Sequence, residues 1–427
     1  MEHSAPLIIW ANFFSDLAVD LPAHGVLERW AEQAPRKVWL IRPGDVLVTP
    51  VPPGPEFLAH ACELLDVPDG SVTVVTAPRL PGTTMADAVE RAGLAERIGA
   101  LAAERRGARL LPVALDRATV ALAARLGLRV APYGPDGVTA SAVETAYRLN
   151  TKAGFRAVAG ELGIRVPPGR VCRGGGLATT ARAMLGRYGR VVLKPDRSAG
   201  GCGLTFLSSA DPALGPLDPG ASGTWVVERH LDVARSVSVQ LITGPGAAPR
   251  VVHSGEMRTA VGSYTGYASP LHGIARRTVR ELERWGTALG VHLAARGYAG
   301  PYGLDAVVTT DGMLYATESN VRRTATTTPQ AMVERLARAA GYEDRAWLVA
   351  SGCTPAARGF ADTLRQLRAE GLAWSPGRGE GVVLYGDAPA DGRSWRYAVI
   401  GPGHTRVTEI EAALTRALAF VPLPGER

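Results

Sequence analysis

Hydrophobic and polar positions in the first 140 residues alternate between short apolar runs and stretches whose apolar residues recur at helical spacing. Buried strands are expected at residues 7–10, 38–41, 72–76 and 110–113. Between the last two, residues 85–105 have the spacing of an amphipathic helix. This alternation predicts a βαβ-type parallel sheet, a Rossmann-like layer of the α/β class. Because the region has no Gly-x-Gly-x-x-Gly, no dinucleotide is assigned to it.

The pattern changes after a turn-rich segment at residues 133–137. A helix is expected from residue 150, with Phe155, Val158, Ala159 and Leu162 on one face and its end at Gly163. Further strands are expected at residues 191–194, 225–228, 237–242, 251–254, 306–309 and 314–317, with helices near 271–295 and 329–340. Strands grouped beside separate helices indicate an α+β lobe.

The C-terminal residues are also expected to be ordered. From about residue 350 they predict a helix through 360–367, strands at 382–385 and 397–400, and a last helix at 407–420. The chain of 427 residues is too long for one ordinary core. We therefore expect three parts, at residues 1–140, 141–345 and 346–427.

Composition and charge narrow the function classes. Hydrophobic residues make up 46% of the chain and charged residues 20%, as in globular proteins. The net charge of +7 is spread along the chain, which favours small anionic ligands and gives no basic stripe for nucleic acid. We expect a cytoplasmic protein without a membrane partner, because no apolar run is long enough to cross a bilayer and the first residues do not match the signal-peptide pattern. A homodimer is the base-rate expectation.

The four cysteines are far apart and include no Cys-x-x-Cys pair. Neither a disulfide framework nor a zinc site is therefore expected.

Two lysines are candidate phosphate contacts. Lys152 lies in the first turn of its expected helix, where the helix dipole disfavours a cation by roughly 0.3 to 1 kcal/mol. Lys194 ends an apolar strand and is followed by a glycine-rich loop in which backbone N–H groups can converge on phosphate oxygens. The candidate loop contacts are Ser198, Gly200, Gly201 and Gly203. A solvated surface lysine and a plain hairpin turn remain the alternative interpretations.

A strand at residues 225–228 ends in a polar step. If an adenine lay against it, Glu228 and the backbone of Arg229 and Leu231 could hydrogen-bond the base edge.

The segment from Gly303 to Arg322 is the strongest candidate site. Two strands joined by a turn at residues 310–312 would run antiparallel and bring Asp305 beside Glu318. Glu318 and Asn320 are two residues apart, so both face the same side of their strand. Three oxygen-bearing side chains on one face are suited to Mg²⁺ that takes its other ligands from water and phosphates. Arg322 points the same way and could stabilise charge on a transferred phosphoryl group, although a polar surface hairpin is the alternative.

These features occur in the order typical of the ATP-grasp superfamily, which the chain resembles: a helix lysine, a strand lysine with a glycine-rich loop, an adenine strand, an aspartate and a Glu-x-Asn. The resemblance implies an ATP-grasp fold preceded by a Rossmann-like pre-ATP-grasp domain, with ATP and Mg²⁺ as cofactors. It places an acidic ribose contact just beyond the adenine strand. Arg235 occupies about that position here, and Asp232 is the nearest acidic substitute.

Within the superfamily, the chain is most similar to peptide ligases of the pheganomycin type, which attach a guanidino-bearing nonproteinogenic amino acid to the N-terminus of a peptide. The similarity rests on residues 318–322 and on the ordered region after residue 350. It implies an ADP-forming ligase of secondary metabolism that joins a small carboxylate to an amine or peptide through an acyl phosphate. An ATP-grasp kinase and a non-catalytic nucleotide-binding protein are the alternatives.

The substrate side is expected in a segment between two strands, at residues 253–267. Its Gly, Ser and Tyr residues favour a mobile cover, with Tyr264 and Tyr267 as substrate contacts. We expect Arg258 to contact the carboxylate or acyl phosphate and Glu256 to contact a cationic group of the substrate. Both charges could equally be solvated loop residues.

Overall fold

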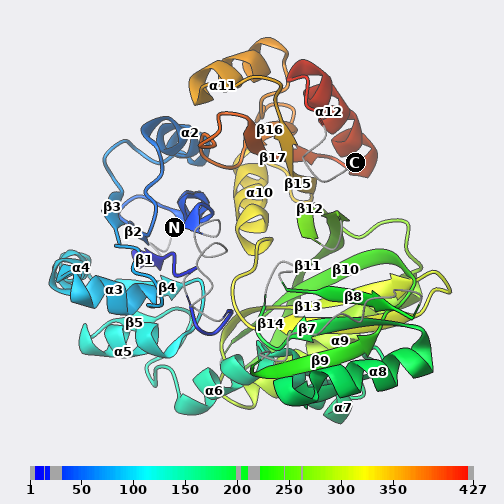
Figure 1. Ribbon diagram of the computed structural model, residues 1–427. Helices are drawn as coiled ribbons and strands as arrows, with labels where there is room; N and C mark the ends of the chain where they lie inside the picture. Colours follow the sequence, from blue (N-terminus) through cyan, green and yellow to red (C-terminus); the bar gives the residue numbers. More distant parts are fainter. Residues whose placement is uncertain are drawn as a thin grey trace.

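The computed structural model describes residues 5–13, 15–19, 31–198, 203–209, 222–244, 246–260 and 263–421. These residues contain one parallel sheet of five strands and two antiparallel sheets of eight and four strands. Figure 1 shows the parallel sheet on one side of the molecule, most of the two antiparallel sheets on the other, and the last two helices of the chain at the top. No described helix has the length and apolar character needed to cross a membrane.

The N-terminal domain is the predicted Rossmann-like layer. Its strands are parallel and lie in the order β3-β2-β1-β4-β5. The strands are β1 (Leu7–Trp10), β2 (Val46–Thr49), β3 (Thr73–Thr76), β4 (Arg109–Pro112) and β5 (Arg129–Val130). The helices are α2 (Pro55–Leu65), α3 (Met85–Arg91), α4 (Leu94–Ala103) and α5 (Arg117–Arg125). The prediction of a βαβ-type parallel sheet is confirmed.

Two predicted elements in this domain are wrong. The expected strand at 38–41 is part of η1 (Ala34–Leu40), a 3₁₀ helix with a proline in its first turn, where the fixed φ of proline favours a helical start. The strand is β2, a few residues later. A short apolar run fits a buried strand or a buried helical turn equally well, so its pattern could not decide between them. The expected helix at 85–105 is two helices, because Gly93 adopts a φ of 67° between them.

Two consecutive helices, α6 (Ala140–Leu149) and α7 (Lys152–Glu161), connect the N-terminal domain to the rest of the chain. The start of α7 is fixed by Thr151, whose hydroxyl accepts a hydrogen bond from the backbone N–H of Gly154 at 3.0 Å. Such an N-cap contributes about 1 kcal/mol to helix stability. It also fixes Lys152 in the first helical turn, as the sequence predicted.

The four-stranded antiparallel sheet has the order β6-β9-β7-β8 and carries α8 on one face. Figure 1 shows this sheet, labelled by β7, β8 and β9, beside the larger antiparallel sheet. The elements are β6 (Gly169–Arg173), β7 (Arg190–Pro195), β8 (Thr205–Ser208), β9 (Thr224–Arg229) and α8 (Leu177–Tyr188). The predicted strands at 191–194 and 225–228 are therefore confirmed.

The eight-stranded sheet runs β14-β13-β10-β11-β12-β15-β17-β16, and α9 (Arg276–Ala294) packs on β10, β11 and β13. Its strands are β10 (Val233–Gly244), β11 (Ala247–Ala260), β12 (Ser263–Ser269), β13 (Gly300–Thr309), β14 (Leu314–Asn320), β15 (Ala346–Cys353), β16 (Gly381–Leu384) and β17 (Ser394–Gly401). The C-terminal strands thus extend the same sheet, so the boundary expected at residue 345 does not separate two sheets.

The expected mobile cover at 253–267 is also not what the structure shows. Residues 253–260 belong to β11, and residues 263–269 form β12, which pairs with β11 on one side and β15 on the other. Tyr267 is fully buried in this position. The described Gly, Ser and Tyr residues that suggested a loop lie in β11 and β12, inside the sheet, because β15, far away in the sequence, covers the edge of β12. Residues 261 and 262 lie outside the described residues.

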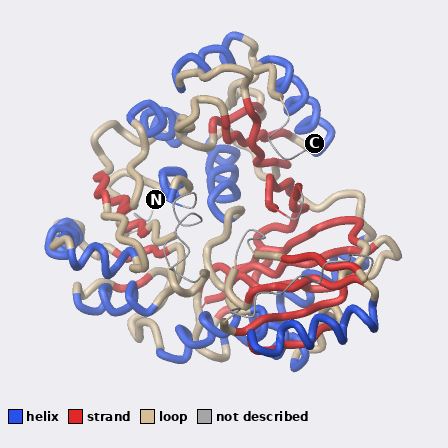
Figure 2. Tube along the Cα trace, viewed as in Figure 1, coloured by secondary structure: helices blue, strands red, loops and turns tan. Residues whose placement is uncertain are grey.

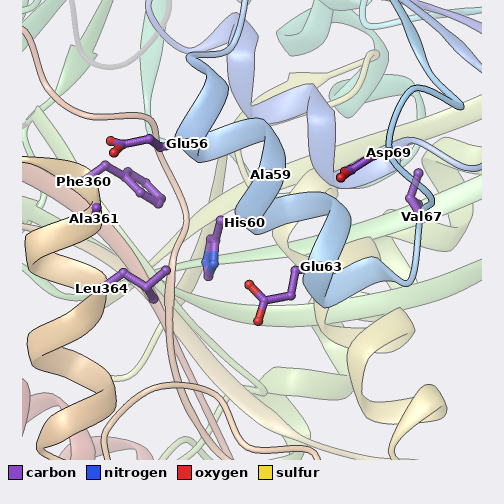
Figure 3. Close-up of a pocket in the computed structure, with 9 residues that line it drawn as sticks. All are labelled: Glu56, Ala59, His60, Glu63, Val67, Asp69, Phe360, Ala361 and Leu364. Carbon is purple, nitrogen blue, oxygen red and sulfur yellow. The ribbon is translucent and has the colours of Figure 1, made fainter.

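The C-terminal helices α10 (Thr327–Ala339), α11 (Phe360–Ala369) and α12 (His404–Ala417) share a hydrophobic core with the N-terminal domain. In that core, Phe360 of α11 packs against Phe57 of α2. Figures 1 and 2 show α10 between the parallel sheet and the C-terminal strands. A surface groove of about 540 Å³ lies between α2 and α11, with His60, Phe360 and Leu364 in its wall (Figure 3). None of the predicted site residues lines this groove.

Two buried histidines give the fold a predicted sensitivity to acid. Neither His60 nor His253 has a hydrogen-bond partner among the described residues. Burial lowers the pKa of His60 from 6.5 to about 4, with a smaller contribution from Arg368, and burial lowers that of His253 to about 3. Both rings are therefore neutral in the fold, whereas an unfolded chain binds a proton at each below pH 6.5.

We expect the free energy of unfolding to fall as the pH is lowered from about 6.5 towards 4, by at most about 1.4 kcal/mol per pH unit for each histidine. Urea unfolding of the wild type and of a His60→Leu/His253→Leu variant at several pH values measures this effect. The free energy of unfolding of the variant should depend less on pH than that of the wild type. An identical pH dependence would contradict the role of the two buried histidines.

Candidate active site

One cavity of about 490 Å³ collects half of the predicted site residues. It lies where the N-terminal domain, the two antiparallel sheets and the C-terminal strands meet. Its wall includes Lys152, Lys194 and Ser198 from one side and Asp305, Glu318, Asn320 and Arg322 from the other. The two lysines and the acidic hairpin therefore open onto the same space.

The acidic face of the cavity is built by β13 and β14. The two strands are antiparallel, with Asp305 directly opposite Glu318 and Gly303 opposite Asn320. The side chain of Asn320 donates a hydrogen bond to Asp305 Oδ2 at 2.8 Å. Ser319, between Glu318 and Asn320, points away and is buried. The predicted positions of the three side chains, close together on this hairpin, are confirmed.

The charges on this face suit a divalent cation. Burial and the neighbouring Glu318 carboxylate raise the pKa of Asp305 well above its ordinary value. Burial alone would raise the pKa of Glu318 too, but Lys152, Lys194 and Arg322 together lower it. Two carboxylates held this close repel each other, and a bound metal ion removes that repulsion.

No group of three or more His, Cys, Asp or Glu side chains within the described ranges is placed to hold a metal. The protein ligands of a cation at this face would therefore be two carboxylates and one amide. This oxygen-only set, with places left for water and phosphate, fits Mg²⁺.

Lys152 faces the acidic hairpin from the start of α7. Its side chain is 8% exposed, and its Nζ lies 3.5 Å from Glu318 Oε2. The same Nζ donates to the backbone oxygen and the hydroxyl of Ser198, at 3.1 Å and 2.9 Å. Lys152 thus connects the start of the glycine-rich loop to the acidic face, which a solvated surface lysine would not do.

Lys194 is fixed by an ion pair behind the cavity wall. Its Nζ lies 2.6 Å from Glu228 Oε2, and Arg156 Nη1 donates to Glu228 Oε1 at 2.6 Å. Glu228 is 2% exposed and does not line the cavity. The structure therefore gives Glu228 the position of a buried counter-ion that orients Lys194, in place of the contact with a base edge that the sequence suggested.

We expect Glu228→Gln to destabilise the fold by about 3 kcal/mol, because it leaves the positive charges of Arg156 and Lys194 buried without a carboxylate. Chemical denaturation of the purified variant measures this loss. Glu144→Gln is the matched control, since Glu144 forms an exposed pair with Arg117 and should contribute at most about 1 kcal/mol. A loss of stability in Glu228→Gln as small as that of the control would contradict the role of Glu228 as the buried counter-ion of Arg156 and Lys194.

The glycine-rich loop is only partly described. Gly200 and Gly201 lie outside the described residues. Gly203 has a φ of 75°, and a Cβ there would lie 2.9 Å from Pro195 Cγ, so a side chain would be strained at this position. The loop therefore returns close to the end of β7, next to Lys194.

The residues expected at the adenine do not line the cavity. Arg229 is exposed, with its guanidinium over the ring of Tyr188. Leu231 is buried, and Asp232 is exposed and paired with Arg190 at 2.5 Å. The structure places all three at the end of β9, beyond the residues that surround the cavity.

Of the four contacts predicted in this segment, two line the cavity and two do not. Tyr264 and Tyr267 of β12 line the cavity, and so do Met257 and Thr259 of β11. Glu256 and Arg258 alternate with these β11 residues and therefore face away from the cavity. Glu256 pairs with Arg235, and Arg258 pairs with Glu411 of α12. The expected contacts of Glu256 and Arg258 with a substrate are wrong for this structure.

Sequence reasoning missed a cationic part of the wall. Arg36 of η1, Arg323 after β14 and Arg396 of β17 all line the cavity. They come from three distant parts of the chain and follow no motif. The one signal in the sequence was the pair Arg36-Lys37 inside an otherwise apolar segment.

Comparisons with known proteins agree with this architecture. A family model described as the pre-ATP-grasp domain matches residues 34–128. These residues lie within the parallel sheet and its helices. A second model, described as the PGM1 C-terminal domain, matches residues 362–414. No curated protein matches the sequence.

Solved structures match over almost the whole chain. N5-carboxyaminoimidazole ribonucleotide synthetase from Thermus thermophilus is 17% identical, with 98% of this chain and 99% of that chain covered and a TM-score of 0.58. The fold is an ATP-grasp fold preceded by a pre-ATP-grasp domain.

Two further ATP-grasp neighbours were solved with nucleotides. The biotin carboxylase from Campylobacter jejuni, in complex with β,γ-ATP, is 14% identical, with 98% and 92% coverage and a TM-score of 0.61. The N5-carboxyaminoimidazole synthase from Aspergillus clavatus, with ADP and 5-aminoimidazole ribonucleotide, is 12% identical, with 98% and 100% coverage and a TM-score of 0.57. At these identities the likeness establishes the fold, and chemistry must be argued from the cavity.

Proposed function

We propose that this protein is an ATP-dependent, ADP-forming ligase that joins a carboxylate to an amine. The observation that carries the proposal is the single cavity in which two lysines face two carboxylates and an amide. Triphosphate oxygens need both positive groups and a divalent cation, and this cavity supplies ligands for each. The ATP-grasp fold supports the proposal, since several neighbours of that fold were solved with ADP or ATP.

In this proposal the phosphates of ATP lie between the acidic hairpin and the loop that follows β7. Lys152 and Lys194 supply positive charge, and Ser198 and Gly203 bring the loop to the phosphates. Asp305, Glu318 and Asn320 would hold Mg²⁺, which when bound neutralises the negative charge of the phosphate oxygens. Gly200 and Gly201, outside the described residues, belong to the same proposed loop contact.

Arg322 is proposed to bind the reacting carboxylate. It lines the cavity two residues after Asn320, and its Nη1 donates to Asn150 Oδ1 at 2.7 Å. Asn150 also accepts a hydrogen bond from the backbone N–H of Val321 at 3.2 Å, so the side chain of Arg322 is oriented from behind. A guanidinium fixed in this way can bind a carboxylate with two parallel hydrogen bonds.

The reaction follows from these positions. A carboxylate oxygen held by Arg322 attacks the γ-phosphorus in line, and ADP leaves with the electron pair of the broken bond. The amine of the second substrate then attacks the acyl carbon, loses a proton and releases phosphate. Positioning and charge neutralisation supply most of the catalysis in such a transfer, so no side-chain nucleophile is needed.

The narrower proposal is peptide bond formation in natural-product biosynthesis. It rests on the sequence resemblance to peptide ligases that attach a nonproteinogenic amino acid to a peptide N-terminus. The match to a named C-terminal domain at residues 362–414 falls in the region on which that resemblance depends.

The test is release of ADP and phosphate by the purified full chain, with ATP, Mg²⁺, pools of amino acids and short peptides. ADP that forms only with both an acid and an amine, with a mass-spectrometric product equal to their condensation, supports the ligase. ADP with a phosphorylated alcohol as product would identify a kinase. No ADP with any pool would contradict both activities.

A further inference from the structure

Part of the cavity wall is cationic, and we call this part the cationic end. It includes Arg36 from the N-terminal domain, Arg323 from the loop after β14 and Arg396 from the C-terminal sheet. Arg36 is 9% exposed. Lys37 lies directly behind, 3% exposed, and donates to the hydroxyl of Thr328 at 2.5 Å. Four positive side chains therefore meet at one place in the fold.

None of these four cations forms an ion pair with a carboxylate of the described residues. Neighbouring positive charges act on two of them. After burial, Arg396 is the main cause of the lowered pKa of Arg36. After burial, Arg323 and Arg36 lower the pKa of Lys37. Arg36 and Lys37 are buried, and burying a positive charge without a counter-ion costs several kcal/mol, so such groups are normally retained beside an anion.

A hydroxyl at the same end also lacks a partner. The phenol oxygen of Tyr264 lines the cavity, is buried, and has no hydrogen-bond partner among the described residues. Arg36 and Arg396 lie near enough to affect its charge. Buried polar groups almost always have partners, so an unpaired hydroxyl beside guanidinium groups that have no carboxylate partner indicates a missing acceptor.

We propose that the acid substrate carries a second anionic group, a carboxylate or a phosphate, which binds Arg36, Arg396 and the hydroxyl of Tyr264. This inference rests on the proposed ligase function and names the chemical class of its acid. The acid is thus a dianion: Arg322 binds the carboxylate that reacts, and the cationic end binds the group that does not.

A cationic side chain on the acid does not fit this end of the cavity. The carboxylate that was expected to receive such a group, Glu256, is paired with Arg235 on the other face of the sheet. Like charges at close distance would instead repel a guanidino or ammonium group from Arg36 and Arg323. The substrate therefore differs in charge from the guanidino-bearing amino acid that the sequence resemblance suggests.

Matched acids test the proposal without knowledge of the natural substrate. Thermal unfolding of the full chain with Mg²⁺ and ADP is measured with glutamate against glutamine, aspartate against asparagine, phosphoserine against serine, and lysine or arginine as cationic members. The dianionic acids are expected to bind at least tenfold more tightly than their neutral partners. The phosphoserine pair distinguishes a phosphate from a carboxylate at the second position.

Two variants assign the preference to the cationic end. Arg36→Gln is expected to remove at least tenfold of the preference for the dianionic acids and to leave binding of ADP unchanged. Arg396→Gln, at an exposed position, gives the same readout if the buried Arg36 variant does not fold. The exposed Arg365→Gln is the control, since Arg365 pairs with Asp362 on the outer face of α11.

Equal binding of dianionic and neutral acids, tighter binding of cationic acids, or no binding by any dianionic acid would overturn the proposal. So would a preference for acidic over neutral peptides as acceptors with no preference among acids, because the anion would then belong to the amine substrate. Failure of the ligase itself gives a different result, since ADP would then neither bind nor form with any acid.

Discussion

Lys194→Ala is expected to lower kcat/KM for ADP formation by about 10²- to 10³-fold, the loss typical when one positioned donor to the reacting centre is removed. Lys194 lines the cavity that contains the acidic hairpin. The fold should remain intact, because Glu228 keeps its hydrogen bond to Arg156 at 2.6 Å when the lysine is lost. Steady-state kinetics of ADP release with the best acid and amine pair measures the effect.

The control for Lys194→Ala is Arg365→Gln, which removes an exposed positive charge far from the cavity. It should turn over at the rate of the wild type. Circular dichroism and the melting temperature of both variants separate catalysis from folding. Near-normal turnover of a folded Lys194→Ala variant would contradict the phosphate contact.

Glu318→Gln is expected to reduce ADP formation by about 10²-fold or more and to raise the Mg²⁺ concentration needed for half-maximal rate. Replacing a residue that only orients a metal ligand typically lowers metal affinity or activity by about 10- to 100-fold. Replacing a direct ligand should lower them at least as much. Glutamine keeps the size of the side chain and an oxygen, while Lys152 keeps its hydrogen bonds to Ser198. The change therefore tests the carboxylate charge itself.

Titration of Mg²⁺ at saturating ATP distinguishes a metal ligand from a general structural role. Glu409→Gln on α12 is the matched control, because Glu409 is exposed and pairs only with Arg406 among the described residues. An unchanged Mg²⁺ dependence of Glu318→Gln, with activity lost, would assign Glu318 to another role. Retained activity would remove it from the site.

The parts of the site that the sequence predicted correctly are local. Asp305 and Glu318 belong to one hairpin, so a turn between two strands was enough to place them opposite each other. Lys152 follows an N-cap threonine, and Lys194 ends an apolar strand beside glycines. Each of these positions depends on a few neighbouring residues, which periodicity and turn chemistry describe well.

The parts that failed depend on pairings between distant segments. The segment taken for a mobile cover becomes an inner strand because β15 pairs with it from about 80 residues further along the chain. That pairing directs Tyr264 and Tyr267 into the cavity. The side chains of Glu256 and Arg258 in β11 lie on the other face of the sheet, where Arg235 and Glu411 neutralise them.

The partners of buried charges also could not be predicted from the sequence. Glu228 was expected to contact a nucleotide base because it ends a strand with a polar step. The structure buries it between Arg156 and Lys194, which lie 72 and 34 residues earlier in the chain. Arg36 and Arg396 are far apart in the sequence, and tertiary packing alone brings them to one cavity. Charges that meet only through tertiary packing leave no periodic signal.

The most direct test is a crystal structure with Mn²⁺ and a non-hydrolysable ATP analogue. The account predicts an anomalous Mn²⁺ signal within about 2.0 to 2.3 Å of oxygens of Glu318 and Asn320, as expected for a small divalent cation with oxygen ligands. It also predicts phosphate oxygens within hydrogen-bond distance of the Nζ atoms of Lys152 and Lys194. A nucleotide in the groove between α2 and α11, or a metal ion away from β13 and β14, would contradict it.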